Sequence, residues 1–337
     1  MRLSYRSKLM LKRFLKIALI LAAVALVAAI IVLIYVEPFV VYDREGAHLE
    51  LNPSTEPTVE LREPETRPVV DNPQIIYSVG NTTGKTIAEL GGYYITTSML
   101  LEPQTVLETV KSLDEPCAVM IQLKSIWGYY YYSTGIGGAE RASIDTGVVD
   151  ELLTYLKSNG FYMIAEIPAF SDMVFALNNQ SCGLPISGGA LWMDENGTYW
   201  LDPADENVLA YLMQIARELA GLGFREVAFS NFTFPSSENI VYSSDKARAE
   251  LVADAAATLS GFFTGSSTVI SFVSDATDFP AASCNGRLYI PNVDGSRVEM
   301  YAQAYKDADT LLELVFKASS RDTRFENRAV LRPLIAE

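Results

Sequence analysis

Histidine and cysteine are scarce, and their scarcity excludes several kinds of site. His48 is the only histidine and lies in an acidic segment, so neither a Ser-His-Asp triad nor a histidine metal site can be built. The three cysteines, Cys117, Cys182 and Cys284, form an odd and widely spaced set that matches neither a disulfide framework nor a zinc motif. We therefore expect no metal and no cofactor. One disulfide, between Cys182 and Cys284, stays open as an alternative to three free thiols.

Basic residues are also in short supply outside the N-terminal tail. The chain has 26 lysines and arginines against 41 acids, for a formal net charge of -15. Six of the bases lie in residues 1–16, which contain no acid, so the remainder is more acidic still. An acidic surface repels phosphate backbones, and we expect no nucleic-acid partner.

A long uncharged apolar run follows the basic tail. Residues 17–36 contain no charge and no proline, and a helix of twenty residues is long enough to cross the hydrocarbon layer of a membrane. The bases before it and the acids after it predict a cytoplasmic N-terminus and an extracytoplasmic C-terminal part. No small-x-small cleavage site follows, which favours a retained single-pass signal anchor in the cell membrane over a cleaved signal peptide.

The next segment, 37–73, resists folding. It contains six prolines, nine acids and three bases, a composition that disfavours helix and buries little apolar surface. We expect a disordered acidic linker there, followed by one folded domain over 74–337.

The folded domain alternates strand-like and helix-like segments, which indicates an α/β fold with a parallel sheet. The pattern predicts helices at 103–113, 146–158, 207–222 and 246–263, and strands at 92–98, 117–124, 161–168, 225–232, 268–273, 288–291 and 328–334. No glycine-rich phosphate loop follows the first strand, so we favour a TIM-type (β/α) barrel over an open doubly wound sheet. Seven strands leave an incomplete barrel open, with 74–78 as a candidate eighth.

Several phrases in order carry a family resemblance over about residues 90–334. They are CAVMIQLKS with GYYYYS, ELLTYLKSNGFYMIAEIPAF, ALWMDENGTYWLDP, LAGLGFREVAFSNFTFP and AVLRPLI. Together they resemble a bacterial family of glycoside hydrolase-like TIM barrels, distantly related to amylase-type barrels. The matched positions are Lys124, Gly128, Trp200, Asp202, Pro203, Phe229, Phe234, Pro235, Arg332 and Pro333.

The sequence departs from that family at its polar strand ends. Where the family carries an Asp on the second strand this chain has Gln122, and an Asp and an Arg are replaced by Ser230 and Thr233. Hydrolysis of a glycosidic bond needs two carboxyl groups. The acids that remain at predicted strand ends are Glu166 and Asp275, our candidate catalytic pair. Helix or turn capping is the alternative role for each of them.

Aromatic residues supply candidate substrate contacts, because sugars stack on aromatic rings. Trp127, Tyr130, Trp192 and Trp200 are the candidates, and the matched positions Lys124 and Asp202 join them. Two structural alternatives stay open. The run Tyr129–Tyr132 is also typical of a β-ribbon with alternate rings packed inward, and Asp202 suits the N-cap of a helix starting near Ala204.

Two functions of different class remain. The first is an active glycoside hydrolase that acts on an envelope or extracellular polysaccharide with Glu166 and Asp275. The second, which we favour because family acids are replaced by neutral residues, is a degenerate barrel that binds carbohydrate without cleaving it. Both predict a carbohydrate partner, and neither names a protein partner.

Overall fold

The computed structural model describes residues 40–43, 46–49, 90–280, 286–305, 313–318, 325 and 328–335. The predicted tail and membrane helix, 1–36, lie outside these residues, as do Cys284 and the segment 74–78. Within the described ranges, every helix is too short or too polar to cross a bilayer. Cys182 carries a free thiol whose Sγ lies 3.6 Å from Asp205 Oδ1.

The chain divides into two units, residues 1–73 and 74–337. In the first unit, β1 (Val40–Asp43) pairs antiparallel with β2 (Gly46–Leu49). These two stretches lie inside the segment 37–73, for which the sequence predicts a disordered linker. The Val-Val-Tyr run of β1 favours a strand there, since β-branched and aromatic residues favour strands.

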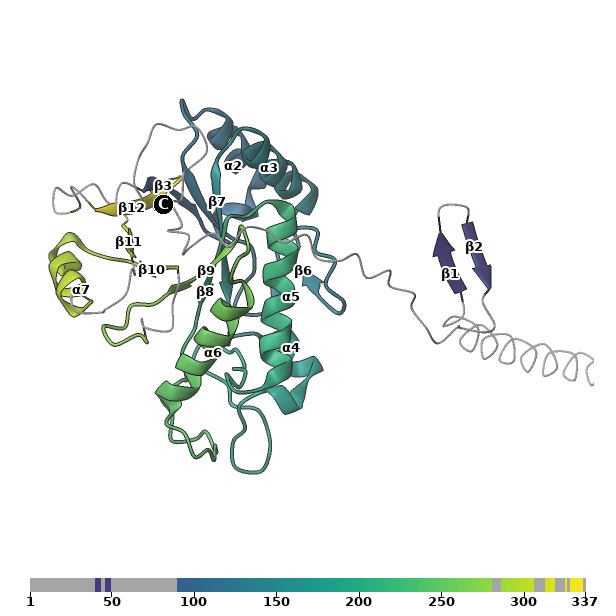
Figure 1. The fold of residues 1–337 in the computed structure, drawn as a ribbon, viewed down its shortest axis with the longest axis vertical. Coiled ribbons are helices and arrows are strands. Elements are labelled where there is room, and N and C mark those ends of the chain that lie inside the picture. Colours follow the sequence, from purple (N-terminus) through teal and green to yellow (C-terminus); the bar gives the residue numbers. More distant parts are fainter. Residues whose placement is uncertain are drawn as a thin grey trace, which may run out of the picture. The chain divides into compact units, whose positions relative to one another are not determined.

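The second unit contains a closed parallel barrel of eight strands (Figure 1). The strands are β3 (Gly91–Ile95), β4 (Ala118–Gln122), β7 (Tyr162–Pro168), β8 (Glu226–Ser230), β9 (Val269–Val273), β10 (Arg287–Ile290), β11 (Glu313–Lys317) and β12 (Ala329–Pro333). All seven predicted strands are present. The barrel is complete, and its eighth strand is β11 rather than 74–78.

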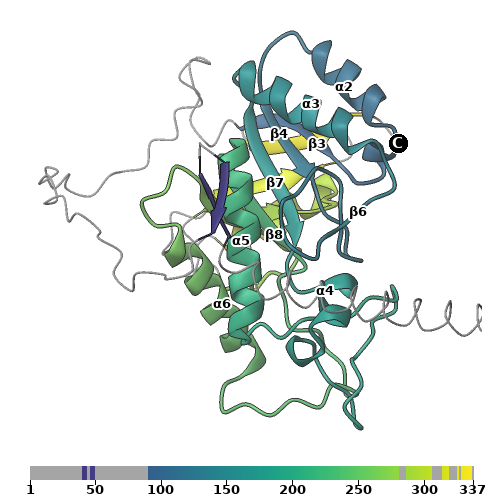
Figure 2. The ribbon, with the colours of Figure 1, turned by 90° about the vertical axis from the view of Figure 1, so that its right-hand side faces the viewer.

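Helices cover the outside of the strands, as two views at right angles show (Figures 1 and 2). They are α2 (Pro103–Lys111), α3 (Thr146–Ser158), α5 (Glu206–Leu222), α6 (Arg248–Phe262) and α7 (Val298–Ala304). The short helix α4 (Met173–Asn178) lies in the loop region after β7. Asp205, and not Asp202, is the N-cap of α5, because its side chain accepts from the amides of Asn207 and Val208. Gly223 ends α5 with φ +107°, a conformation that glycine adopts without strain.

Alternation along the strands decides which side chains enter the barrel. On β4, Val119 and Ile121 pack outward against the helices, and Met120 packs inward with Ile164 of β7. The same alternation brings the side chains of Gln122 and Glu166, which are register partners, to the inner side of the barrel at its carboxyl end.

A buried polar cluster closes the opposite end. The carboxylate of Glu226, at the start of β8, pairs with Arg287 and accepts hydrogen bonds from Tyr162, Tyr289 and Ser271. Burial, followed by the charge of Glu226, raises the pKa of the Tyr162 hydroxyl, so the tyrosine stays a donor. Four strands are thereby joined through one carboxylate.

We predict that Glu226→Ala lowers the free energy of unfolding by about 3–5 kcal/mol, because removing one partner of a buried ion pair leaves the other uncompensated. Among the described acids Arg287 would keep Glu313, whose Oε2 is 3.5 Å from its Nε, and it would still donate to the Tyr162 hydroxyl. Denaturant unfolding followed by circular dichroism measures the change. Glu238→Ala is the control because Glu238 is exposed. Equal stability of the two variants would contradict a supporting role for the cluster.

Candidate functional site at the carboxyl end of the barrel

A cavity of about 740 Å³ opens at the carboxyl end of the barrel. Strand ends and the loops after them line it, as in other βα barrels. The lining residues are Tyr94, Thr96, Thr97, Ser98, Gln122, Lys124, Ser125, Ile126, Trp127, Glu166, Pro168, Trp200, Ser230, Asn231, Phe232, Thr233, Val273, Ser274, Asp275, Ala276, Pro291, Asn292 and Lys317. Both predicted acids therefore face one cavity.

Glu166 lies on the inner wall with only 4% of its surface exposed. Its Oε2 accepts from Lys317 Nζ at 2.5 Å, and its Oε1 accepts from Gln122 Nε2 at 3.0 Å. The Oε1 of Gln122 in turn accepts from the backbone N–H of Thr97 at 3.1 Å. Both oxygens of the Glu166 carboxylate therefore have donors, and the side chain is fixed as an acceptor in the cavity wall.

Asp275 has the opposite surroundings. It follows β9 on an exposed loop, and its backbone carbonyl accepts from the Tyr301 hydroxyl at 3.0 Å. Among the described residues its carboxylate makes no hydrogen bond or ion pair, and it does not cap a helix. The cavity therefore has one buried, paired acid in its wall and one solvated acid at its rim.

Two tryptophans line the cavity from separate loops. Trp127 follows β4 and exposes 43% of its surface, whereas Trp200 exposes 7% and donates its Nε1–H to Asp194 Oδ2 at 2.9 Å. Trp192 does not line the cavity. Its ring packs beside Trp200, with 6.4 Å between centroids. The exposed face of Trp127 is the one suited to stacking on a ligand.

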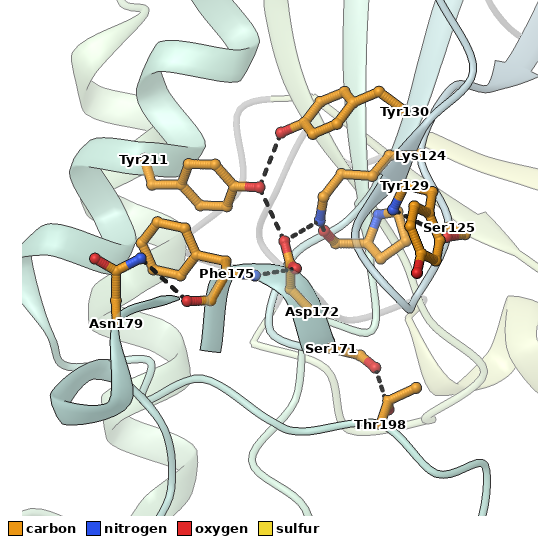
Figure 3. Close-up of polar contacts among 11 residues, drawn as sticks. Lys124, Ser125, Tyr129, Tyr130, Ser171, Asp172, Phe175, Asn179, Thr198 and Tyr211 are labelled. Carbon is orange, nitrogen blue, oxygen red and sulfur yellow. Dashed lines mark hydrogen bonds and ion pairs between the residues drawn. The ribbon is translucent and has the colours of Figure 1, made fainter. Parts of the chain in front are cut away.

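Lys124 lines the cavity, but its side chain is fully buried in an ion pair (Figure 3). Its Nζ lies 2.6 Å from Asp172 Oδ2 and donates to the carbonyl of Pro168 at 3.3 Å. Asp172 also accepts from the Tyr211 hydroxyl at 2.9 Å and caps α4 through the amide of Phe175. Lys124 thus fixes the loop after β7 to the end of β4.

The last two predicted contacts lie outside the cavity lining. Tyr130 is buried, its hydroxyl is 2.8 Å from that of Tyr211, and burial raises its pKa. Tyr130 belongs to β5 (Tyr129–Tyr130), which pairs with β6 (Glu140–Arg141), so the β-ribbon alternative describes the tyrosine run. Asp202 accepts from the amide of Ala204 and from the Tyr242 hydroxyl, both at 2.9 Å, and shapes the turn before α5.

Among the lining residues that the sequence analysis did not name, three are notable. Lys317 belongs to the unrecognised strand β11. Asn231 and Asn292 follow β8 and β10, and they are the two non-glycine residues of the described ranges with positive φ, at 49° and 51°. Asparagine tolerates this conformation, and such residues concentrate at functional sites. An asparagine within two residues of the end of a buried strand is the sequence signal that could have identified these two. No group of three or more metal-binding side chains occurs in the described part of the chain.

Comparison with known proteins places the barrel in a family. A family model with the description "Putative glycosyl hydrolase domain" matches residues 92–278. A hypothetical protein from Ruminiclostridium thermocellum is similar in structure, with 22% identity and a TM-score of 0.46 over 54% of this chain and 96% of that one. The glycoside hydrolase domain of PelA from Pseudomonas aeruginosa shows 12% identity and a TM-score of 0.41 over 71% and 86%. A Flavobacterium johnsoniae chitobiase shows 12% identity and a TM-score of 0.43 over 68% of this chain and 38% of that one. No curated protein sequence matches.

Asp194, which holds Trp200 in the wall, gives a prediction about pH. Burial acts to raise the pKa of Asp194, but hydrogen bonds from Trp200, Thr198 and Asn196 outweigh it and hold this pKa below its ordinary value. A carboxylate with a depressed pKa stabilises the fold above its unfolded pKa, and this contribution is lost as pH falls through the folded pKa. Below about pH 4, Asp194→Asn should therefore flatten the loss of stability seen in the unaltered chain.

The measurement is the midpoint of urea unfolding, followed by tryptophan fluorescence at neutral and acid pH. Glu195→Gln is the matched control, because Glu195 is the exposed neighbour. If both variants follow the same acid profile as the unaltered chain, Asp194 does not hold Trp200 through its charge.

Proposed function

This chain belongs to the family of glycosyl hydrolase domains whose model it matches, and we propose that its barrel binds carbohydrate without cleaving it. One observation carries the proposal: the buried acid of the cavity, Glu166, is held between Lys317 and Gln122 as a paired carboxylate. Gln122, which donates to Glu166, is neutral, whereas the family that the sequence resembles carries an Asp at this position. A general acid for the leaving group is therefore missing from the cavity wall.

The remaining groups of the cavity suit sugar hydroxyls. Hydroxyl and amide side chains supply both donors and acceptors, and they include Thr97, Ser98, Ser230, Asn231 and Asn292. Trp127 supplies the flat apolar face on which the C–H face of a pyranose stacks. A cavity of this size lies within the range of ligand sites.

The runner-up function is hydrolysis, because both candidate acids line one cavity. A buried ionised carboxylate fixed by two donors is suited to be the nucleophile of a retaining glycosidase, and Asp275 at the rim would then be the acid and base. The substrate would be an envelope or extracellular polysaccharide.

The proposal also includes the cellular location of the chain. The apolar run 17–36 anchors the chain in the cell membrane, with residues 1–16 in the cytoplasm and the barrel outside. The acidic, proline-rich stretch 37–73 connects anchor and barrel. The composition of these segments supports this arrangement. An anchored barrel facing outward meets polysaccharides of the envelope or of the surroundings.

Binding is tested with the full chain on an array of neutral and charged polysaccharides. We expect Trp127→Ala to weaken binding to the retained glycan about tenfold or more, because stacking on an exposed ring is lost. Phe262→Ala is the matched control, since Phe262 also exposes 43% of its surface and lies on α6 outside the cavity. Equal binding by both variants, or no glycan bound at all, would overturn the proposal.

Hydrolysis is tested by the release of reducing ends from the bound polysaccharide. We expect no release above the uncatalysed rate from the unaltered chain, and no change in Glu166→Gln or Asp275→Asn. Release by the unaltered chain that both substitutions abolish would establish the hydrolase instead and refute a binding-only barrel.

A further inference from the structure

A second cavity, of about 670 Å³, lies on the side of the barrel and shares no lining residue with the first. It is enclosed by the segment from β5 to β6, by α4 and by the first turns of α5, elements that lie together in Figure 2. Its lining includes Tyr130, Phe175, Asn178, Asn207, Tyr211 and Gln214. We call it the side cavity.

A rigid aromatic pair forms one wall of the side cavity. The rings of Phe175 and Tyr211 are stacked, with centroids 4.0 Å apart and planes at 18° (Figure 3). The Tyr211 hydroxyl is already bonded to Tyr130 and to Asp172, which pairs with Lys124. Since the buried network fixes the ring, its position is set before any ligand arrives, and little conformational entropy is lost on binding.

Exposed amide groups form another part of the wall. The side chains of Asn178, Asn207 and Gln214 make no hydrogen bond to other described residues, and all three are exposed. Asn179 donates its Nδ2–H to the carbonyl of Phe175 at 3.0 Å, which leaves its Oδ1 for a ligand. Each such amide offers two donors and one acceptor oxygen, the complement of a row of hydroxyls.

Charge and space narrow the class of ligand. Among the described residues, none that lines the side cavity carries a charge, although one residue in five of the chain is charged. A phosphate, a carboxylate or an ammonium group would find no counter-ion there. Gly137 and Gly138 leave open space, because a Cβ built on either meets no atom within 4 Å. Amides around fixed rings, without charge, match a neutral saccharide.

We propose that the side cavity is a second carbohydrate site that takes a neutral pyranose unit. The sugar packs its C–H face against the Phe175 and Tyr211 pair, and the amides of Asn207 and Gln214 bond its hydroxyls. The inference rests on the proposed function for the class of ligand but on different residues. With two sites on one chain, a polysaccharide that reaches both binds more tightly than either site alone allows.

The test is calorimetric titration of the full chain with cellohexaose, laminarihexaose and chitohexaose, three neutral oligosaccharides. The variant is Asn207→Ala with Gln214→Ala, two surface changes on α5 to a good helix former. The control is Gln104→Ala with Asn239→Ala, which removes two exposed polar amides that line neither cavity. Far-ultraviolet circular dichroism checks that each variant is folded.

We expect two binding events per chain for at least one of the three probes. The double variant on α5 should weaken one event tenfold or more and leave the other unchanged, and Trp127→Ala should do the reverse. The control should bind as the unaltered chain does.

The outcomes separate the two proposals. A single event lost in Trp127→Ala and unaffected by the α5 variant overturns the side cavity site and leaves the barrel function standing. A single event lost only in the α5 variant supports the side site and overturns binding at the barrel end. If no oligosaccharide binds, but an uncharged decapeptide binds and is lost in the α5 variant, the side cavity is a peptide site and the saccharide proposal is wrong.

Discussion

The pairing of Glu166 with Lys317 is the contact on which the character of the barrel end depends. It joins β7 to β11 across the interior, and both side chains are almost fully buried. A single charge at this depth would be strongly unfavourable, so each residue makes the other tolerable. Gln122 adds a neutral hydrogen bond where a second acid would have placed like charges side by side. This one contact thus links β11 to β7 and leaves Glu166 paired in the cavity wall.

Two further ion pairs among the described residues are also buried, and they lie elsewhere in the barrel domain. Arg287 and Glu226 close the amino end, and Lys124 and Asp172 lie between the two cavities. Each pair neutralises charge that the strands and loops bring inward, and hydroxyl groups complete the bonding of Glu226 and Asp172. Buried pairs of this kind contribute more to fixed geometry than to net stability. The cavities are left with neutral donors, acceptors and rings, apart from Asp275 at the rim of the larger one.

Much of the fold follows from local sequence signals, and the exceptions have physical causes. Strands such as β7 are mostly apolar runs bounded by turn residues, with Glu166 as the one charged residue of β7, so they are recognised without tertiary information. β11 directly follows Thr-Leu-Leu, so its Glu-Leu-Val-Phe-Lys sequence looks like the continuation of a helix. Only pairing with β10 and β12 makes it a strand. Because the sequence analysis did not predict β11, it also missed Lys317, the ion-pair partner of Glu166.

Part of the site can likewise be predicted from the sequence, and part depends on tertiary contacts. That Glu166 and Asp275 face one cavity follows from the strand-end rule, because parallel strands bring their carboxyl ends to one rim. What each acid does there depends on contacts between residues distant in sequence: 151 positions separate Lys317 from Glu166. The same limit applies to Lys124 and Tyr130, whose chemistry pointed to a ligand but whose partners, Asp172 and Tyr211, lie on other elements. Sequence locates the groups, whereas the pairing of buried charges decides which of them remain for a ligand. Among the described residues of this barrel, the buried charged side chains are paired with one another, and the unpaired groups that line the two cavities are neutral apart from Asp275.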